Sequence, residues 1–143
     1  FGRFVGDTAD SHSSALTKYR TVLNTEPLPN EQISREQMRD EPPHILLTNY
    51  AMLEYLLLRP EDTGLFDGPT GRHWKFIVLD EVHVYNGARG AEIAMLLRRV
   101  RDRVSASEPG SISFVGTSAT LGSGESGVEE VAADWRQHRK SCG

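Results

Sequence analysis

The segment 76–83 constrains the fold and the chemistry of this chain more than any other. Four apolar residues, Phe76–Leu79, run directly into two carboxylates and then a histidine. A short apolar run without alternation is typical of a strand that is buried on both faces, as in a parallel sheet. Open α/β folds bind their ligands at the carboxyl ends of such strands. We therefore expect Asp80, Glu81 and His83 to lie at a ligand-binding edge of a parallel sheet.

Two adjacent acids at such an edge suit nucleotide chemistry. Asp80 can hold Mg²⁺, directly or through water, and Glu81 can orient or deprotonate an attacking water molecule. The alternative is a strand that ends in a solvated acidic turn. A match to a four-residue pattern does not decide between the two, because short motifs recur by chance.

Length and composition place the chain among ordinary soluble domains. It has 143 residues, of which 38% are apolar and 25% charged, so it can bury a core and is not expected to be disordered. No apolar run approaches the roughly 20 residues needed to span a bilayer. The single cysteine, Cys142, cannot form an internal disulfide, so we expect a reduced, cytoplasmic protein without a membrane partner. The chain opens without Met inside a predicted strand, and we expect it to be a piece of a longer protein.

The net charge of −4 gives no broad positive surface for nucleic acid. A groove that binds phosphates through amides and hydroxyls remains possible at this charge. The arginines of segment 98–103 are expected on a solvated helix face. His44, His73 and His138 have no spacing that indicates a metal site, and we do not propose zinc.

Strands alternate with helices along the chain, which predicts a parallel α/β sheet flanked by helices. The predicted helix at 50–59 is apolar almost all round and is expected to be buried against a sheet. The glycine-rich segment 61–72 is expected to be a surface loop. Strands are predicted at 1–5, 44–48, 76–79 and 112–116. Helices are predicted at 15–23 and at 50–59. A short helix is predicted to begin at a capping box formed by Ser34 and Gln37, and another helix follows a tight connection at 85–90. A final helix is predicted from a second capping box at Ser126 to Trp135.

Four motifs in order resemble those of superfamily 2 helicases. Segment 80–83, Asp-Glu-Val-His, is similar to motif II, and Ser-Ala-Thr at 118–120, after the next strand, to motif III. Thr-Asn at 48–49 is similar to motif Ib, and Gly-Asp at 6–7 to the turn that precedes it. The sequences of segments 48–53 and 85–90 further resemble those of large bacterial DEAD/DEAH-box helicases related to DNA-repair helicases with a cysteine-rich C-terminal domain. The resemblance implies that residues 1–143 form an incomplete first RecA-like domain, of the P-loop NTPase type, with the motif Ib, II and III regions.

The resemblance also implies roles at the nucleotide. Asp80 is the expected Mg²⁺ ligand and Glu81 the expected catalytic base for water that attacks the γ-phosphate of ATP. His83 is expected to couple the nucleotide site to motif III, where the hydroxyls of Ser118 and Thr120 bond motif II side chains. The alternatives are an ordinary polar histidine at a sheet edge and an ordinary Ser/Thr-rich turn.

Thr48 and Asn49 are expected to hold a nucleic-acid phosphate where a strand meets a helix N-terminus. They could equally be a simple N-cap, and both readings can hold together. Gly6 and Asp7 are expected on the same nucleic-acid track, although a strand-ending Gly-Asp turn is common. The resemblance favours DNA over RNA.

The chain contains no G-x-x-x-x-G-K-[ST] sequence, the Walker A loop that cradles the phosphates of ATP. Its lysines are Lys18, Lys75 and Lys140, and none follows a glycine. We therefore expect the fragment alone to be inactive, with the second RecA-like domain among the partners it lacks. Without the strands of the P-loop and of motif Ia, the motif II and III strands can still pair. The motif Ib strand would then face a gap, which predicts marginal stability, with the N-terminal part docking loosely or re-pairing against the motif II strand.

The sequence thus predicts a fragment of an ATP-dependent helicase or translocase that uses ATP and Mg²⁺. One alternative is a non-catalytic interaction module that retains the fold. The other, weaker alternative is a metal-dependent hydrolase using Asp80, Glu81 and His83, which would need further ligands at that site.

Overall fold

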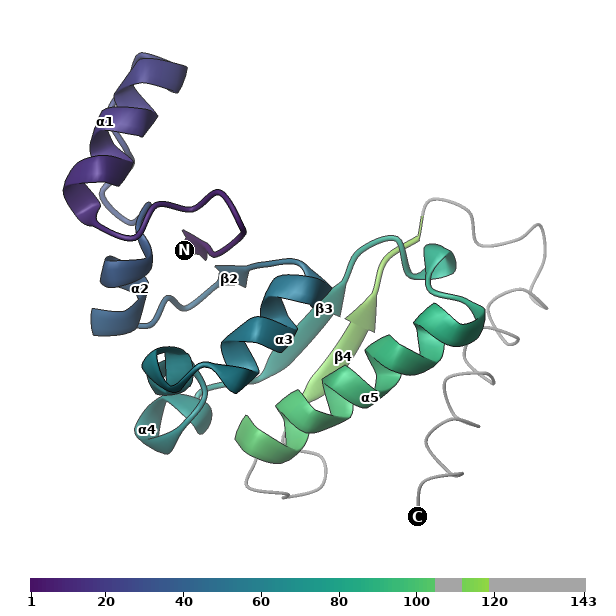
Figure 1. Ribbon diagram of the computed structural model, residues 1–143. Helices are drawn as coiled ribbons and strands as arrows, with labels where there is room; N and C mark the ends of the chain where they lie inside the picture. Colours follow the sequence, from purple (N-terminus) through teal and green to yellow (C-terminus); the bar gives the residue numbers. More distant parts are fainter. Residues whose placement is uncertain (105–111, 119–143) are drawn as a thin grey trace. The chain divides into compact units, whose positions relative to one another are not determined.

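A computed structural model describes residues 1–104 and 112–118 of the chain (Figure 1). The chain divides into two compact units, 1–72 and 73–143, and each is described by itself below. Strands alternate with helices in both units, and all described strands pair in parallel. The α/β class and the parallel pairing predicted from the sequence are confirmed.

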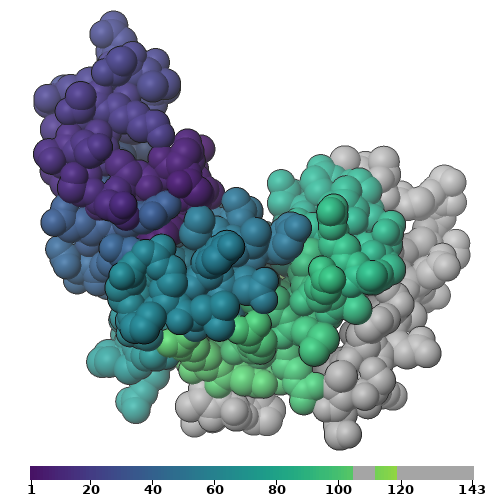
Figure 2. Space-filling view, in the orientation of Figure 1, coloured from purple at the N-terminus to yellow at the C-terminus, as the bar shows by residue number. Residues whose placement is uncertain are grey.

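The first unit is built on two very short parallel strands. Gly2 lies opposite Leu46 and Arg3 opposite Leu47. The helix α1 lies at the outside of this unit, and Figure 2 shows its atoms at the surface. Of its residues, only Ala15 is buried. The elements of the unit are β1 (Gly2–Arg3), α1 (His12–Leu23), α2 (Arg35–Asp40), β2 (Leu46–Leu47), α3 (Tyr50–Leu58), the 3₁₀ helix η1 (Pro60–Leu65) and α4 (Gly68–Gly71).

The predicted helix boundaries in this unit are set by local capping. The capping box is present, since the Ser34 hydroxyl accepts from the Gln37 amide and the Gln37 side chain returns to the backbone of Ser34. The helix α1 ends at Asn24, whose φ of 51° is the left-handed conformation that asparagine tolerates. The helix α3 begins after Asn49, whose side chain accepts from the Met52 amide at 2.8 Å.

Two expectations for this unit are wrong. The helix α3 is not buried, because only Leu56 is fully covered, while Tyr55 is 62% and Leu58 64% exposed. Two strands of two residues each have too little area to cover a helix of nine residues.

Segment 61–72 is not a surface loop either. It forms η1 and α4, and it buries Asp62, Leu65 and Phe66. Pro60 starts η1, where its missing amide costs nothing, and the apolar pair Leu65–Phe66 enters the core.

The second unit pairs the two strands that precede the predicted motifs II and III. Its elements are β3 (Phe76–Leu79), the 3₁₀ helix η2 (Val82–Val84), α5 (Gly87–Val104) and β4 (Ser113–Gly116). The strands β3 and β4 run parallel with Phe76 opposite Ser113 and Leu79 opposite Gly116, as predicted for the motif II and III strands. One face of α5 is buried, through Ile93, Leu96, Leu97, Val100 and Val104. Four of these, Ile93, Leu97, Val100 and Val104, have the spacing of one helix face, and the helix starts at Gly87, inside the predicted tight connection.

The strand β3 is not buried on both faces. Ile77 is buried, whereas Phe76 is 64% and Val78 61% exposed. This alternation is that of a sheet covered on one side, since successive side chains of a strand point to opposite faces. Two outcomes were expected for the N-terminal part, loose docking or re-pairing of the motif Ib strand against the motif II strand. Re-pairing is wrong for the described strands, because β2 pairs with β1.

Some expectations lie outside the described residues. Thr120 and the final helix predicted from Ser126 to Trp135 are among them. Within the described part of the chain, no helix is both long and apolar enough to cross a membrane.

Candidate functional site

The polar ends of β3 and β4 are held together by backbone hydrogen bonds. The Thr117 amide donates to the Leu79 carbonyl at 2.9 Å, and the Val82 amide donates to the Thr117 carbonyl at 2.9 Å. Because Leu79 lies opposite Gly116, the next residues along the strands, Asp80 and Thr117, are neighbours at the carboxyl edge. The parallel pairing therefore brings motif II and the start of motif III to one place.

The carboxylate of Asp80 is fixed on one side and open on the other. Its Oδ1 accepts a short hydrogen bond from the Thr117 hydroxyl and another from the Glu81 amide at 3.1 Å. Among the described residues, its Oδ2 has no hydrogen-bond partner. Asp80 thus offers one oriented oxygen to a ligand.

Glu81, His83 and Ser118 form a second connection between the two motifs. Nδ1 of His83 lies 3.1 Å from Glu81 Oε2 and 2.9 Å from the Ser118 hydroxyl oxygen. The hydrogen bond of Nδ1 is the one with Ser118, and the Glu81 carboxylate lies within ion-pair distance of the same nitrogen. The Glu81 side chain is 47% and the His83 side chain 36% exposed, which leaves both accessible to a ligand.

Backbone geometry at two positions supports this arrangement. Glu81 has a φ of 52° and a ψ of 48°, a left-handed conformation that costs a non-glycine residue about 1–2 kcal/mol. Such costs concentrate at functional sites. At Gly116, a Cβ atom would lie 2.9 Å from Cγ1 of Val82, so glycine lets β4 approach η2 closely.

The donors at this edge fit Mg²⁺ bound with a nucleotide better than a metal held by protein alone. Mg²⁺ is commonly held by one or two carboxylates, with water and substrate phosphates completing the octahedron. The open Oδ2 of Asp80 provides one such oxygen. Among the described residues, no group of three or more His, Cys, Asp or Glu side chains could hold a metal ion. The metal-hydrolase alternative therefore finds no additional ligands there.

The predicted nucleic-acid residues lie in the first unit. The Thr48 hydroxyl donates to the Phe4 carbonyl at 2.7 Å, and the Asn49 side chain caps α3. Both side chains are thus used within the protein. In the described part of the chain, the amides of Tyr50 and Ala51, in the first turn of α3, have no acceptor, as is usual at a helix N-terminus.

The Gly6–Asp7 turn is held from several sides. The Thr8 amide donates to the Val5 carbonyl at 3.1 Å, which closes the turn. The Asp7 carboxylate lies 3.4 Å from Arg3 Nη2 and 3.6 Å from Lys18 Nζ. The hydrogen bond from Thr48 to Phe4, just before the turn, connects it to the start of α3. The structure therefore brings the two predicted nucleic-acid segments together.

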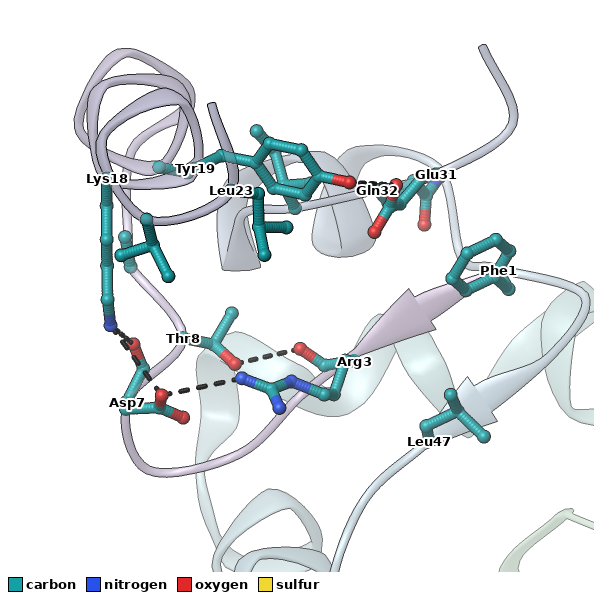
Figure 3. A pocket seen from close by; sticks show the side chains of 14 residues that line it. Phe1, Arg3, Asp7, Thr8, Lys18, Tyr19, Leu23, Glu31, Gln32 and Leu47 are labelled. Atoms are coloured by element: carbon teal, nitrogen blue, oxygen red, sulfur yellow. Dashed lines mark hydrogen bonds and ion pairs between the residues drawn. The ribbon is translucent and has the colours of Figure 1, made fainter. Parts of the chain in front are cut away.

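A cavity of about 450 Å³ lies beside this turn (Figure 3). Lys18, Asp7 and Arg3 gather at one end, whereas Tyr19 and Glu31 lie at the other. The Tyr19 hydroxyl donates to Glu31 at 2.9 Å, and this hydrogen bond raises the pKa of Tyr19 above its usual 10.0.

Two residues with prominent contacts were not singled out by the sequence. Thr117, beside the proposed metal ligand, could have been found by pairing the ends of the two strands. Arg35 bonds the turn from 29 and 30 residues away, and no local pattern indicates that contact.

Comparisons with known proteins agree with the predicted family. Residues 8–126 match the family model of the DEAD/DEAH box helicase. The chain is 39% identical over 127 residues to Druantia protein DruE of Escherichia coli (strain UMEA 4076-1), covering 83% of this chain and 7% of that protein. It is 37% identical over 83 residues to the uncharacterized ATP-dependent helicase YprA of Bacillus subtilis (strain 168), covering 54% of this chain and 10% of that protein.

Two further similarities point the same way. ATP-dependent helicase Lhr-Core of Methanocaldococcus jannaschii is 28% identical over 94 residues, which cover 66% of this chain and 10% of that protein. The crystal structure of the DUF1998 helicase MrfA superposes with a TM-score of 0.55 and 26% identity, over 92% of this chain and 16% of that one. The chain thus spans only a small part of each relative. Since the family model covers most of its length, this chain belongs to the DEAD/DEAH box helicase family.

Proposed function

We propose that this chain is part of the first RecA-like domain of an ATP-dependent helicase or translocase. It supplies the acids of Mg-ATP hydrolysis and part of the nucleic-acid track. The observation that supports this most is the pair of contacts at the ends of β3 and β4, Thr117 to Asp80 and Ser118 to His83. These contacts connect motif II to motif III, as a motor that senses its nucleotide requires.

At the nucleotide, Asp80, whose Oδ2 is open, would hold Mg²⁺, and the ion would neutralise charge on the phosphates. The Glu81 carboxylate accepts a proton from the attacking water. The His83 ring, whose Nδ1 lies 3.1 Å from Oε2, keeps that carboxylate oriented. Ser118, bonded to the same nitrogen, transmits a change at Glu81 to the segment that follows β4.

At the nucleic acid, phosphates are contacted mainly by backbone amides. The first turn of α3 offers the amides of Tyr50 and Ala51 beside the Asn49 cap, and Thr48 precedes that cap. Amides at a helix N-terminus bind anions without any need for a basic surface. We propose DNA as the preferred substrate, on the resemblance of the motifs.

The Walker A lysine and the arginine of a second RecA-like domain come from other parts of the longer protein in this proposal. The 143 residues contain no Walker A sequence. The activity accordingly belongs to the longer protein, and the fragment alone is inactive.

The decisive experiment is ATP hydrolysis by the longer protein with and without single-stranded DNA and RNA. Glu81→Gln should lower kcat by about a hundredfold or more, because a general base is typically worth 10²–10⁴ in rate. Glu92→Gln, which removes the same charge from α5, should leave kcat unchanged. Hydrolysis that survives Glu81→Gln would refute the assignment of the base. No hydrolysis by the wild-type protein would favour the non-catalytic module.

A further inference from the structure

One guanidinium group holds the turn that precedes the predicted phosphate contacts. Nη2 of Arg35 donates to the Val5 carbonyl at 3.2 Å and to the Gly6 carbonyl at 3.1 Å. These two carbonyls belong to consecutive peptide planes. Arg35 therefore fixes both planes from one side of the turn.

The guanidinium of Arg35 is itself held in place. Nη1 donates to Asp10 at 3.2 Å, and the guanidinium carbon lies 5.3 Å from the centre of the Phe4 ring. Phe4 is fully buried, and the Arg35 side chain is only 13% exposed. From the next turn of α2, Arg39 lies over the same ring at 5.9 Å. A stacked, hydrogen-bonded guanidinium of this kind has little freedom to move.

Fixing a carbonyl also fixes the amide on the same peptide plane. In a planar trans peptide, the N–H points opposite to the C=O of the preceding residue. The bonds from Arg35 to the carbonyls of Val5 and Gly6 therefore turn the amides of Gly6 and Asp7 away from the guanidinium. Among the described residues, neither amide has an acceptor. Consecutive free amides that face one direction are a common way of binding anions.

We propose that Arg35 is a positioning residue for nucleic-acid binding, which aims the Gly6 and Asp7 amides at a backbone phosphate. The inference rests on the proposed function of this turn as part of the nucleic-acid track. Arg35 acts through the turn and does not itself contact the phosphate, because its guanidinium lies on the carbonyl side.

The test is Arg35→Lys, which keeps the positive charge and removes the planar hydrogen-bonding geometry of the guanidinium. A lysine at this position has one ammonium group, which cannot reproduce the planar fork that bonds two carbonyls and Asp10 together. In the longer protein, Arg35→Lys should weaken binding of a fluorescein-labelled oligothymidylate about tenfold, measured by anisotropy. The DNA concentration for half-maximal ATPase should rise by the same factor, while kcat at saturating DNA stays unchanged. Arg20→Lys, at an exposed arginine that pairs with Glu26, is the matched control and should change neither value.

A second variant keeps the proposal testable if Arg35→Lys fails to fold. The Asp10 side chain is 75% exposed, so Asp10→Ala is not expected to disturb folding. Loss of a negative charge alone would tighten binding to DNA, whereas release of the Arg35 guanidinium should weaken it about threefold. Tighter binding by Asp10→Ala, or unchanged binding by a folded Arg35→Lys, overturns the proposal. A wild-type longer protein that binds no nucleic acid overturns the proposed function itself, which is a separate outcome.

Discussion

Thr117 shows how a single hydroxyl can organise the proposed nucleotide-binding edge. It donates to Oδ1 of Asp80, while its backbone amide and carbonyl connect it to Leu79 and Val82. Three of its groups thus bond the polar end of β3. Because Oδ1 is occupied, the oxygen left for a ligand is Oδ2, and the orientation of the carboxylate depends on Thr117.

We predict that Thr117→Val in the longer protein lowers kcat about tenfold, since loss of a hydrogen bond to a charged group costs roughly 1.5–3 kcal/mol. Thr117→Ser should restore most of the activity, because it returns the hydroxyl. The Mg²⁺ concentration that gives half-maximal rate should rise in the valine variant. A valine variant with normal kcat and normal Mg²⁺ dependence would show that Asp80 is oriented by other groups.

At the scale of elements, a buried charge joins α2 to η1. Asp62 is fully buried, and its Oδ1 accepts from Nε of Arg39 at 2.7 Å. Its Oδ2 lies 3.4 Å from Nε of Arg59, close enough for attraction but without hydrogen-bond geometry. Arg39 also stacks on Phe4, so this ion pair fixes the helix that carries Arg35.

We predict that Asp62→Ala lowers the free energy of unfolding by about 3–5 kcal/mol, because it removes the buried partner of Arg39 and leaves only the half-exposed Glu61 carboxylate beside it. Glu61→Gln is the matched control at the next position, where the side chain is 52% exposed and the loss should stay below about 1 kcal/mol. Urea unfolding followed by circular dichroism measures both. Equal small losses in the two variants would mean that Asp62 contributes no more than a surface ion pair.

At the scale of the whole molecule, the chain combines well-formed local elements with few strands to cover them. Each described sheet has two strands. Exposed apolar side chains on both units, such as Phe76, Val78, Tyr55 and Leu58, are the consequence. Exposed apolar area of this kind is usual where another surface packs.

We predict that the 143-residue chain alone binds Mg-ATP more weakly than a Kd of about 1 mM, which corresponds to roughly −4 kcal/mol. The longer protein should bind it in the micromolar range. The physical reason is the absence of a Walker A loop, whose amides and lysine hold the β- and γ-phosphates. Calorimetric titration distinguishes the two. Tight binding by the chain alone would mean that other groups cradle the phosphates.

The sequence by itself determined the order of the motifs and most of the local elements, segment 61–72 excepted. Caps at Ser34 and Asn49, and the apolar run before Asp80, are signals carried by neighbouring residues, and the structure bears them out. The polar residues that follow β3 and β4 were likewise visible, because a strand end is a local feature. The pairing of these two strands was predicted as well.

Only the tertiary structure decided which side chains meet and which are covered. The hydrogen bond from Thr117 to Asp80 depends on the register of two strands, and the bonds from Arg35 to the Gly6 turn depend on how α2 packs. The burial of Asp62 depends on its ion pair with Arg39, which lies 23 residues away in the sequence. Exposure of α3 and of one face of β3 likewise depends on how much sheet is present. These contacts join residues far apart in sequence, so no local propensity encodes them.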